Sequence, residues 1–133
     1  ICEGASEKAF IDYMMNTKWP ELKEKHIYCL DALGKYNIHR YIVLLTKFGL
    51  SHSVLMDFDE DSKQHKYVNE FVKSRISKLH GFEKDFEAFL DITPVPKNRN
   101  DLKPLNVLKN YEDGNITEDK IEELKEIIKN LTI

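Results

Sequence analysis

Residues 53–61 read SVLMDFDED, an apolar run that stops abruptly at a series of carboxylates. A short, continuous apolar run is typical of a strand that is buried on both faces of a sheet. The chain then becomes amphipathic, with apolar residues at helical spacing from Tyr67 to Val72. This stretch therefore predicts a buried strand, an acidic loop and a helix.

The same order of elements is predicted twice before residue 53. Ile1-Cys2 reads as the end of a strand and leads through Gly4 into an amphipathic helix. Residues 26–30 (HIYCL) are β-prone and precede a helix that Asn37 would cap and Gly49 would end. Strands that alternate with amphipathic helices indicate an α/β fold, with a parallel sheet flanked by helices.

The second half of the chain is less regular. Residues 74–79 could extend a helix or form a further strand, and residues 83–90 have an ambiguous period. Pro94 and Pro96 break the chain before a short helix predicted from about residue 103 to 111. A clear amphipathic helix, capped by Thr117, is predicted over residues 117–131. The fold therefore ends in a helical C-terminal segment.

Length and composition limit the class of protein. The chain has 133 residues, which suit one domain, with 41% hydrophobic and 32% charged residues. Its formal net charge of −3 argues against a freestanding electrostatic DNA binder, which usually carries a basic patch. Neither a bilayer-spanning run nor a signal-type segment is seen, so we expect a cytoplasmic protein with no membrane partner.

The first residues and the cysteines lead to two further expectations. Ile1 stands where an initiator Met would be, inside what reads as a strand, so we expect a fragment of a larger protein. Cys2 and Cys29 lie in apolar segments outside any CxxC pair. We expect them to act as small apolar residues; a disulfide is possible but not indicated.

Carboxylates follow two of the predicted strands. In open α/β sheets, ligands bind beyond the carboxyl ends of the strands, where Glu3 and the pair Asp57 and Asp59 are expected. Residues two apart in an extended segment point to the same side, so the two aspartates could share one ion. Mg²⁺ prefers such oxygen ligands. Glu7, one helical turn after Glu3, could extend the cluster.

Other interpretations of the acidic residues remain open. The acidic run alone could be a solvated loop, an N-cap cluster or a calcium-binding turn, and His65 could contact metal or phosphate. A receiver domain or a dehalogenase-like phosphatase also places aspartates after a parallel strand, but would not need Glu3. The chain contains neither GxGxxG nor GxxxxGK[ST], so any ATP hydrolysis would belong to another part of the protein.

Four motifs together resemble those of one family. Glu3-Gly4-Ala5-Ser6-Glu7 resembles the EGxxE signature of TOPRIM domains, and Asp57-Phe58-Asp59 resembles their DxD signature. Both signatures are shared with primases and topoisomerases. Residues 85–90 (DFEAFL) and 103–106 (KPLN) are similar to later motifs of the OLD family (overcoming lysogenization defect) of ATP-dependent endonucleases, which resemble proteins used in bacterial defence against phage.

The resemblance implies a Rossmann-like TOPRIM fold and a role for each matching residue. Glu3, Asp57 and Asp59 would hold the principal metal, and Glu7 with either Glu83 or Glu87 would serve a second metal position. We favour Glu87 because it lies in the Asp-Phe-Glu pattern. Lys103 would stabilise charge that develops on the scissile phosphate.

The resemblance also implies a reaction and partners. The expected activity is hydrolysis of DNA phosphodiester bonds with two Mg²⁺ or Mn²⁺ ions. The expected partners are DNA, an N-terminal ATPase region of the same chain, and further copies in a homo-oligomer. The alternative is a catalytically silent TOPRIM-like module that mediates assembly or regulation.

Overall fold

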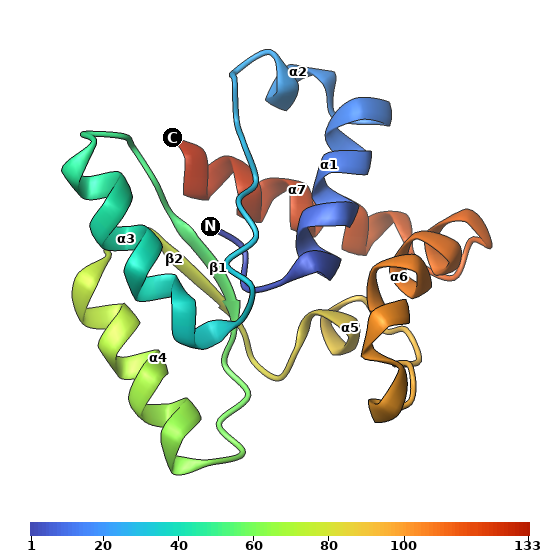
Figure 1. The fold of residues 1–133 in the computed structure, drawn as a ribbon. Helices are drawn as coiled ribbons and strands as arrows, with labels where there is room; N and C mark the ends of the chain where they lie inside the picture. Colours follow the sequence, from blue (N-terminus) through green and yellow to red (C-terminus); the bar gives the residue numbers. More distant parts are fainter.

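The computed structural model describes residues 1–133, which form a mixed α/β fold around a small parallel sheet (Figure 1). Strands β1 (Val54–Asp57) and β2 (Leu79–Phe82) pair in parallel, with Val54 opposite Leu79 and Asp57 opposite Phe82. The predicted fold class is confirmed. The ambiguous residues 74–79 divide between the end of a helix at Arg75 and the start of β2.

Two short segments extend the sheet beyond β1. Cys2 forms single parallel bridges to Leu55 on one side and to Asp31 on the other. The Cys2 amide donates to the carbonyl of Leu30 at 2.7 Å. Four parallel segments therefore lie side by side, although only β1 and β2 are full strands.

The prediction of a strand at residues 26–30 is wrong in extent. His26 has a φ of 55°, outside the β region, so the chain becomes extended only after it. The pairing with the first segment is then confined to one bridge, at Asp31. Cys2 and Asp31 nevertheless bring the residues that follow them to the same edge of the sheet as Asp57.

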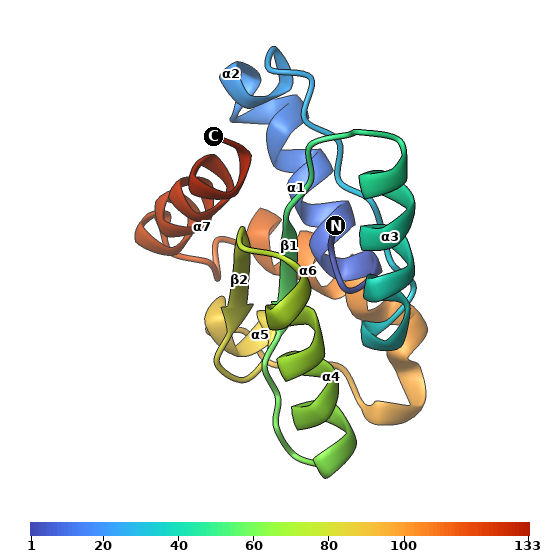
Figure 2. The ribbon, with the colours of Figure 1, turned by 90° about the vertical axis from the view of Figure 1, so that its left-hand side faces the viewer.

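Helices cover both faces of the sheet (Figures 1 and 2). The helices α3 and α4 lie together on one face, and α1 and α7 lie on the other. A kinked 3₁₀ segment, Lys97–Leu102, leads into α6. The helices are α1 (Ala5–Thr17), α2 (Pro20–Lys23), α3 (Ile38–Lys47), α4 (Lys63–Arg75), α5 (Phe86–Phe89), α6 (Lys103–Glu112) and α7 (Glu118–Thr132), with a further 3₁₀ turn at Lys35–Asn37.

Strand β1 is buried on both faces because its side chains alternate between two cores. Val54 and Met56 belong to a cluster with Ile42 of α3 and Val72 of α4. Leu55 belongs to a larger cluster of 17 buried residues, formed mainly by α1, α5, α6 and α7. The continuous apolar run in the sequence thus packs against both hydrophobic cores of the molecule.

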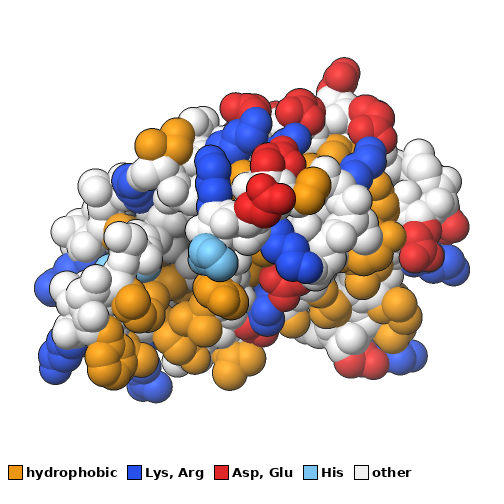
Figure 3. All heavy atoms as spheres, turned by 90° about the horizontal axis from the view of Figure 1, so that it is seen from above, with side chains coloured by type: hydrophobic (Ala, Val, Ile, Leu, Met, Phe, Trp, Pro, Cys, Tyr) orange, Lys and Arg blue, Asp and Glu red, His pale blue; other side chains and the backbone are white.

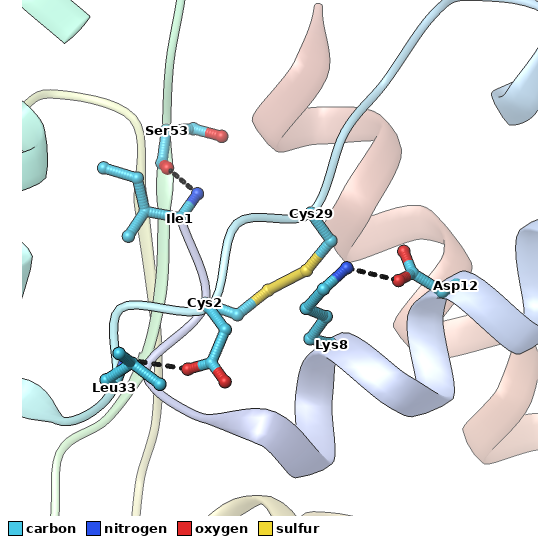
Figure 4. The surroundings of a disulfide bond; sticks show 8 residues. Ile1, Cys2, Lys8, Asp12, Cys29, Leu33 and Ser53 are labelled. Carbon is cyan, nitrogen blue, oxygen red and sulfur yellow. Dashed lines mark hydrogen bonds and ion pairs between the residues drawn. A yellow bond between two sulfur atoms is a disulfide. The ribbon is translucent and has the colours of Figure 1, made fainter.

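Cys2 and Cys29 form a disulfide, shown in Figure 4. The expectation that they act as free apolar residues is therefore wrong, because the bridge between Cys2 and Asp31 brings the neighbouring Cys29 within reach. The first residues are further fixed by the amino group of Ile1, which donates to the carbonyl of Ser53 at 2.7 Å. These contacts anchor the segment that immediately precedes Glu3.

The surface carries charges of both signs. Figure 3 shows acidic and basic side chains intermixed on one face, with hydrophobic side chains gathered along one side of it. None of the helices has the length and apolar character needed to cross a bilayer.

Candidate metal centre

Glu3 and Asp57 meet where their two parallel segments end. A side-chain oxygen of Glu3, Oε2, accepts a hydrogen bond from the backbone amide of Asp57 at 2.9 Å. Burial raises the pKa of Glu3, against the opposing effects of this hydrogen bond and of the nearby Lys35. The pair joins the first segment of the sheet directly to the end of β1.

A cleft of about 550 Å³ opens at this edge of the sheet. Five acidic residues and one lysine line it, together with the Gly4 turn, Gly34 and Asn100. One of the five, Asp31, was not among the residues predicted from the sequence. The charged lining residues from the sequence prediction are Glu3, Glu7, Asp57, Glu87 and Lys103. The structure thus brings together residues that are up to 100 positions apart in the chain.

Asp57 has the most perturbed environment in the cleft. Its Oδ1 atom is buried and has no hydrogen-bond partner. Burial, followed by the charges of Glu7, Glu3 and others, raises the pKa of Asp57 to about 9. Without a bound cation, this carboxyl group is therefore protonated at neutral pH.

Glu7 and Glu87 form the buried side of the cleft. Each is 5% exposed, an unusual environment for glutamate. Burial and the nearby charges of Glu3 and Glu87 raise the pKa of Glu7 to about 7, and Lys103 opposes this shift. Glu7 is held in place by the first turn of α1, and Glu87 by α5, whose N-cap Asp85 accepts a hydrogen bond from Ala88.

Asp59 does not line this cleft. It lines a neighbouring hollow, and it is ion-paired with the buried Lys35. His65 Nδ1 lies 2.6 Å from Asp61 and 3.8 Å from Asp59. Ligand atoms of Asp59, Asp61 and His65 all lie within 4.8 Å of one another, so these three residues could hold a metal ion themselves.

This arrangement differs from the single centre predicted for Glu3, Asp57 and Asp59. The chain leaves the sheet after Asp57, and the Asp59 side chain is ion-paired with Lys35 and does not line the cleft. Asp59 still acts electrostatically on the cleft, since its charge raises the pKa values of both Glu3 and Asp57.

The structure places Glu83 and Glu87, the two candidates for the second metal position, in different environments. Glu87 is buried in the cleft, whereas Glu83 is exposed and lies in the neighbouring hollow with Asp59. Lys103 lines both spaces at the start of α6. Glu87 is therefore the one that shares a site with Glu3 and Asp57.

A close aromatic contact fixes the loop between Asp57 and Asp59. The Phe58 ring lies over Gly81 of β2 so closely that a Cβ atom there would be 2.1 Å from Phe58 Cζ. The Phe58 amide also donates to the carbonyl of Phe82 at 2.7 Å, and Lys73 Nζ lies 4.2 Å from the ring centroid. Only glycine at position 81 allows this position of the loop.

Sequence reasoning missed Lys35, Asn100 and the association of Asp61 with His65. Lys35 follows Gly34 just after the segment that bridges Cys2, so its place at the carboxyl edge of the sheet was a usable signal. Asp61 and His65 are four residues apart, where the loop enters α4. Asn100 belongs to an irregular segment and offered no comparable signal.

Comparison with known proteins gives one match. Residues 1–59 match the family model described as "Overcoming lysogenization defect protein-like, TOPRIM domain". No curated protein and no solved structure matches the chain. The matched segment includes Glu3, Glu7, Asp57 and Asp59 but ends before Glu87 and Lys103. The match supports the resemblance found in the first two motifs.

Proposed function

We propose that the chain is a metal-dependent endonuclease domain, because residues 1–59 match the TOPRIM domain model of OLD-like proteins. Its substrate is DNA, and its reaction is hydrolysis of a phosphodiester bond with Mg²⁺ or Mn²⁺. The observation that carries this proposal is the buried, unpartnered Oδ1 atom of Asp57 in a cleft with four other acidic residues. Such an atom is normally satisfied by a hydrogen bond or a cation.

The residues present fit a divalent cation. Burial raises the pKa values of Glu3, Glu7 and Asp57, and neighbouring carboxylates raise each of them further, so their negative charges are poorly compensated within the protein. A hard cation with oxygen ligands removes this repulsion. Glu3, Asp57, Glu7 and Glu87 would hold ions in the cleft, and Asp59 would join them after release from Lys35 or hold an ion with Asp61 and His65.

When two ions are bound, they supply activation of water and stabilisation of the leaving oxygen. The protein's own contribution is to place a phosphate. Lys103 also lines the cleft, where its ammonium group would bind a phosphate oxygen and stabilise the additional charge that develops during cleavage.

Two features are also consistent with a catalytically silent module that mediates assembly or regulation. Asp59 is ion-paired with Lys35, and the cleft sits in a chain with net charge −3, which by itself attracts nucleic acid weakly. We further propose that DNA binding is completed in a larger protein, with an N-terminal ATPase region and more than one copy of the chain, in bacterial defence against phage.

Nicking of supercoiled plasmid DNA in Mg²⁺ or Mn²⁺ tests the proposed activity. We expect Asp57→Asn and Glu87→Gln to reduce the nicking rate at least 100-fold, and Lys103→Met about 10-fold or more. Glu83→Gln is the matched control because the residue is exposed and outside the cleft. Equal nicking by the wild type, Asp57→Asn and Glu87→Gln would refute the site, and no nicking by the wild type would favour the silent module.

A further inference from the structure

A groove of about 270 Å³ lies between α3 and α4, outside the acidic cleft. It is lined by four aromatic side chains and one valine: Tyr36, His39, Tyr67, Val68 and Phe71. Tyr36 is 54% exposed and Tyr67 is 69% exposed. Large aromatic rings that gather in a groove and remain open to solvent mark a binding surface.

The rings of the groove are arranged around Phe71. Tyr67 stacks on Phe71 with centroids 6.5 Å apart and an angle of 23° between planes. His39 meets Phe71 edge-on, with centroids 5.9 Å apart. On the same ring, the guanidinium carbon of Arg75 lies 4.7 Å from the centroid. These contacts hold Phe71 half-buried and leave most of Tyr67 accessible to a planar ligand.

The two helices that form the groove are basic, although the chain as a whole is acidic. Within α3 and α4, Glu70 is the only acidic residue. Their basic residues are Arg40, Lys47, Lys63, Lys66, Lys73 and Arg75. Exposed rings on helices that carry mostly positive charge fit a ligand that combines planar aromatic groups with a polyanion.

The groove is in direct contact with the acidic loop. The ring centroid of Tyr36 lies 6.2 Å from that of His65, whose Nδ1 atom pairs with Asp61. Tyr36 also directly follows Lys35, the ion-pair partner of Asp59. The groove therefore adjoins the loop that begins directly after Asp57, the residue at the end of β1 that lines the cleft.

We propose that this groove binds an unstacked base of the nucleic-acid strand whose phosphate enters the cleft. The inference rests on the proposed function and narrows its substrate to single-stranded or locally unpaired nucleic acid. Bases inside a duplex are stacked on each other, whereas an unpaired base has a free face for Tyr67 or Tyr36. The basic residues of α3 and α4 contact the phosphates on either side.

The test is a binding measurement by fluorescence anisotropy in EDTA, so that no cleavage is involved. The probes are a labelled thymidine oligonucleotide, an abasic oligonucleotide with the same number of phosphates, and a duplex of the same length. We expect the thymidine strand to bind about 10-fold more tightly than the abasic strand and more tightly than the duplex. Tyr67→Leu should reduce binding of the thymidine strand about 5-fold to 10-fold, whereas Tyr67→Phe should retain it.

Tyr28→Leu is the control, because Tyr28 is 86% exposed but lies outside the groove. Equal affinity for the thymidine and abasic strands, or equal losses in Tyr67→Leu and Tyr28→Leu, would overturn the proposal. A change in oligomeric state of Tyr67→Leu by sedimentation, without a change in strand binding, would also overturn it and assign the groove to a second copy of the chain. Failure of plasmid nicking would refute the proposed activity and leave this binding result unaffected.

Discussion

Replacing Asp57 with asparagine should stabilise the metal-free protein. Folding buries the Asp57 carboxyl group and raises its pKa from an ordinary value of 3.8 to about 9. At pH 7 the group is ionised in the unfolded chain and protonated in the folded protein, so folding must take up a proton. With about 1.4 kcal/mol for each pH unit above 3.8, this uptake costs at most about 4 kcal/mol at pH 7.

Asparagine is neutral in both states and avoids this cost. Its amide group would find no hydrogen-bond partner at the position of Oδ1. This destabilises the folded variant by about 1–3 kcal/mol and offsets part of the gain in stability. We therefore expect Asp57→Asn to increase the free energy of unfolding by about 1–3 kcal/mol at pH 7 in EDTA. Urea denaturation monitored by circular dichroism would measure this difference.

The pH dependence gives the sign of the effect independently. Because the folded-state pKa is the higher one, the stability that Asp57 contributes is fully present below about pH 4 and is lost as the pH rises toward 9. The gain from Asp57→Asn should therefore increase from pH 5 to pH 8. A variant that is less stable than the wild type at every pH in EDTA, with a constant difference, would refute this reasoning.

Four other outcomes follow from the same structure. Gly81→Ala should lower the free energy of unfolding by about 1–3 kcal/mol, and adding Phe58→Ala to the same chain should recover part of that loss. If urea denaturation shows that the losses of the two single variants simply add in the double variant, the contact between residues 58 and 81 is contradicted. Lys35→Met should increase Mn²⁺ affinity several-fold by calorimetry, because it frees Asp59 from its ion pair; unchanged affinity would show that Asp59 does not bind the ion. Reduction of the Cys2–Cys29 disulfide should lower the free energy of unfolding by about 3 kcal/mol, and the stability of Cys29→Ser should not respond to reductant. Equal stability of the reduced and oxidised wild type would contradict a stabilising role of the disulfide. Mg²⁺ should raise the melting temperature of the wild type more at pH 8 than at pH 6, since the protons on Glu7 and Asp57 must leave before the ion binds; a pH-independent shift would contradict that linkage.

The sequence predicted the parts of the fold that local patterns determine. The apolar run before Asp57 and the amphipathic pattern from Thr117 to Leu131 correspond to β1 and α7, because burial on both faces or on one face leaves a direct periodic signal. Residues 26–30 were wrongly extended into a strand, since β propensity cannot show where a partner segment ends. The disulfide was missed for the same reason: it depends on the alignment of two segments distant in sequence.

The candidate site was likewise only partly predictable from the sequence. Glu3, Glu7 and Asp57 could be placed together because each follows a predicted strand or begins a helix at one edge of the sheet. The position of Asp59 could not be predicted, since it depends on a competing ion pair with Lys35. Glu87 was favoured over Glu83 on a motif alone, and its burial at the cleft comes from the irregular path between β2 and α5.

The most direct test of the central claim is the position of bound Mn²⁺, measured by anomalous diffraction from crystals of the chain grown with this ion. We expect an ion in the cleft, coordinated by Asp57 together with Glu3 or Glu7, within about 2.5 Å of their carboxylate oxygens. Saturating Mn²⁺ with no anomalous peak near Asp57 would contradict it, even if a peak were present at Asp59, Asp61 and His65.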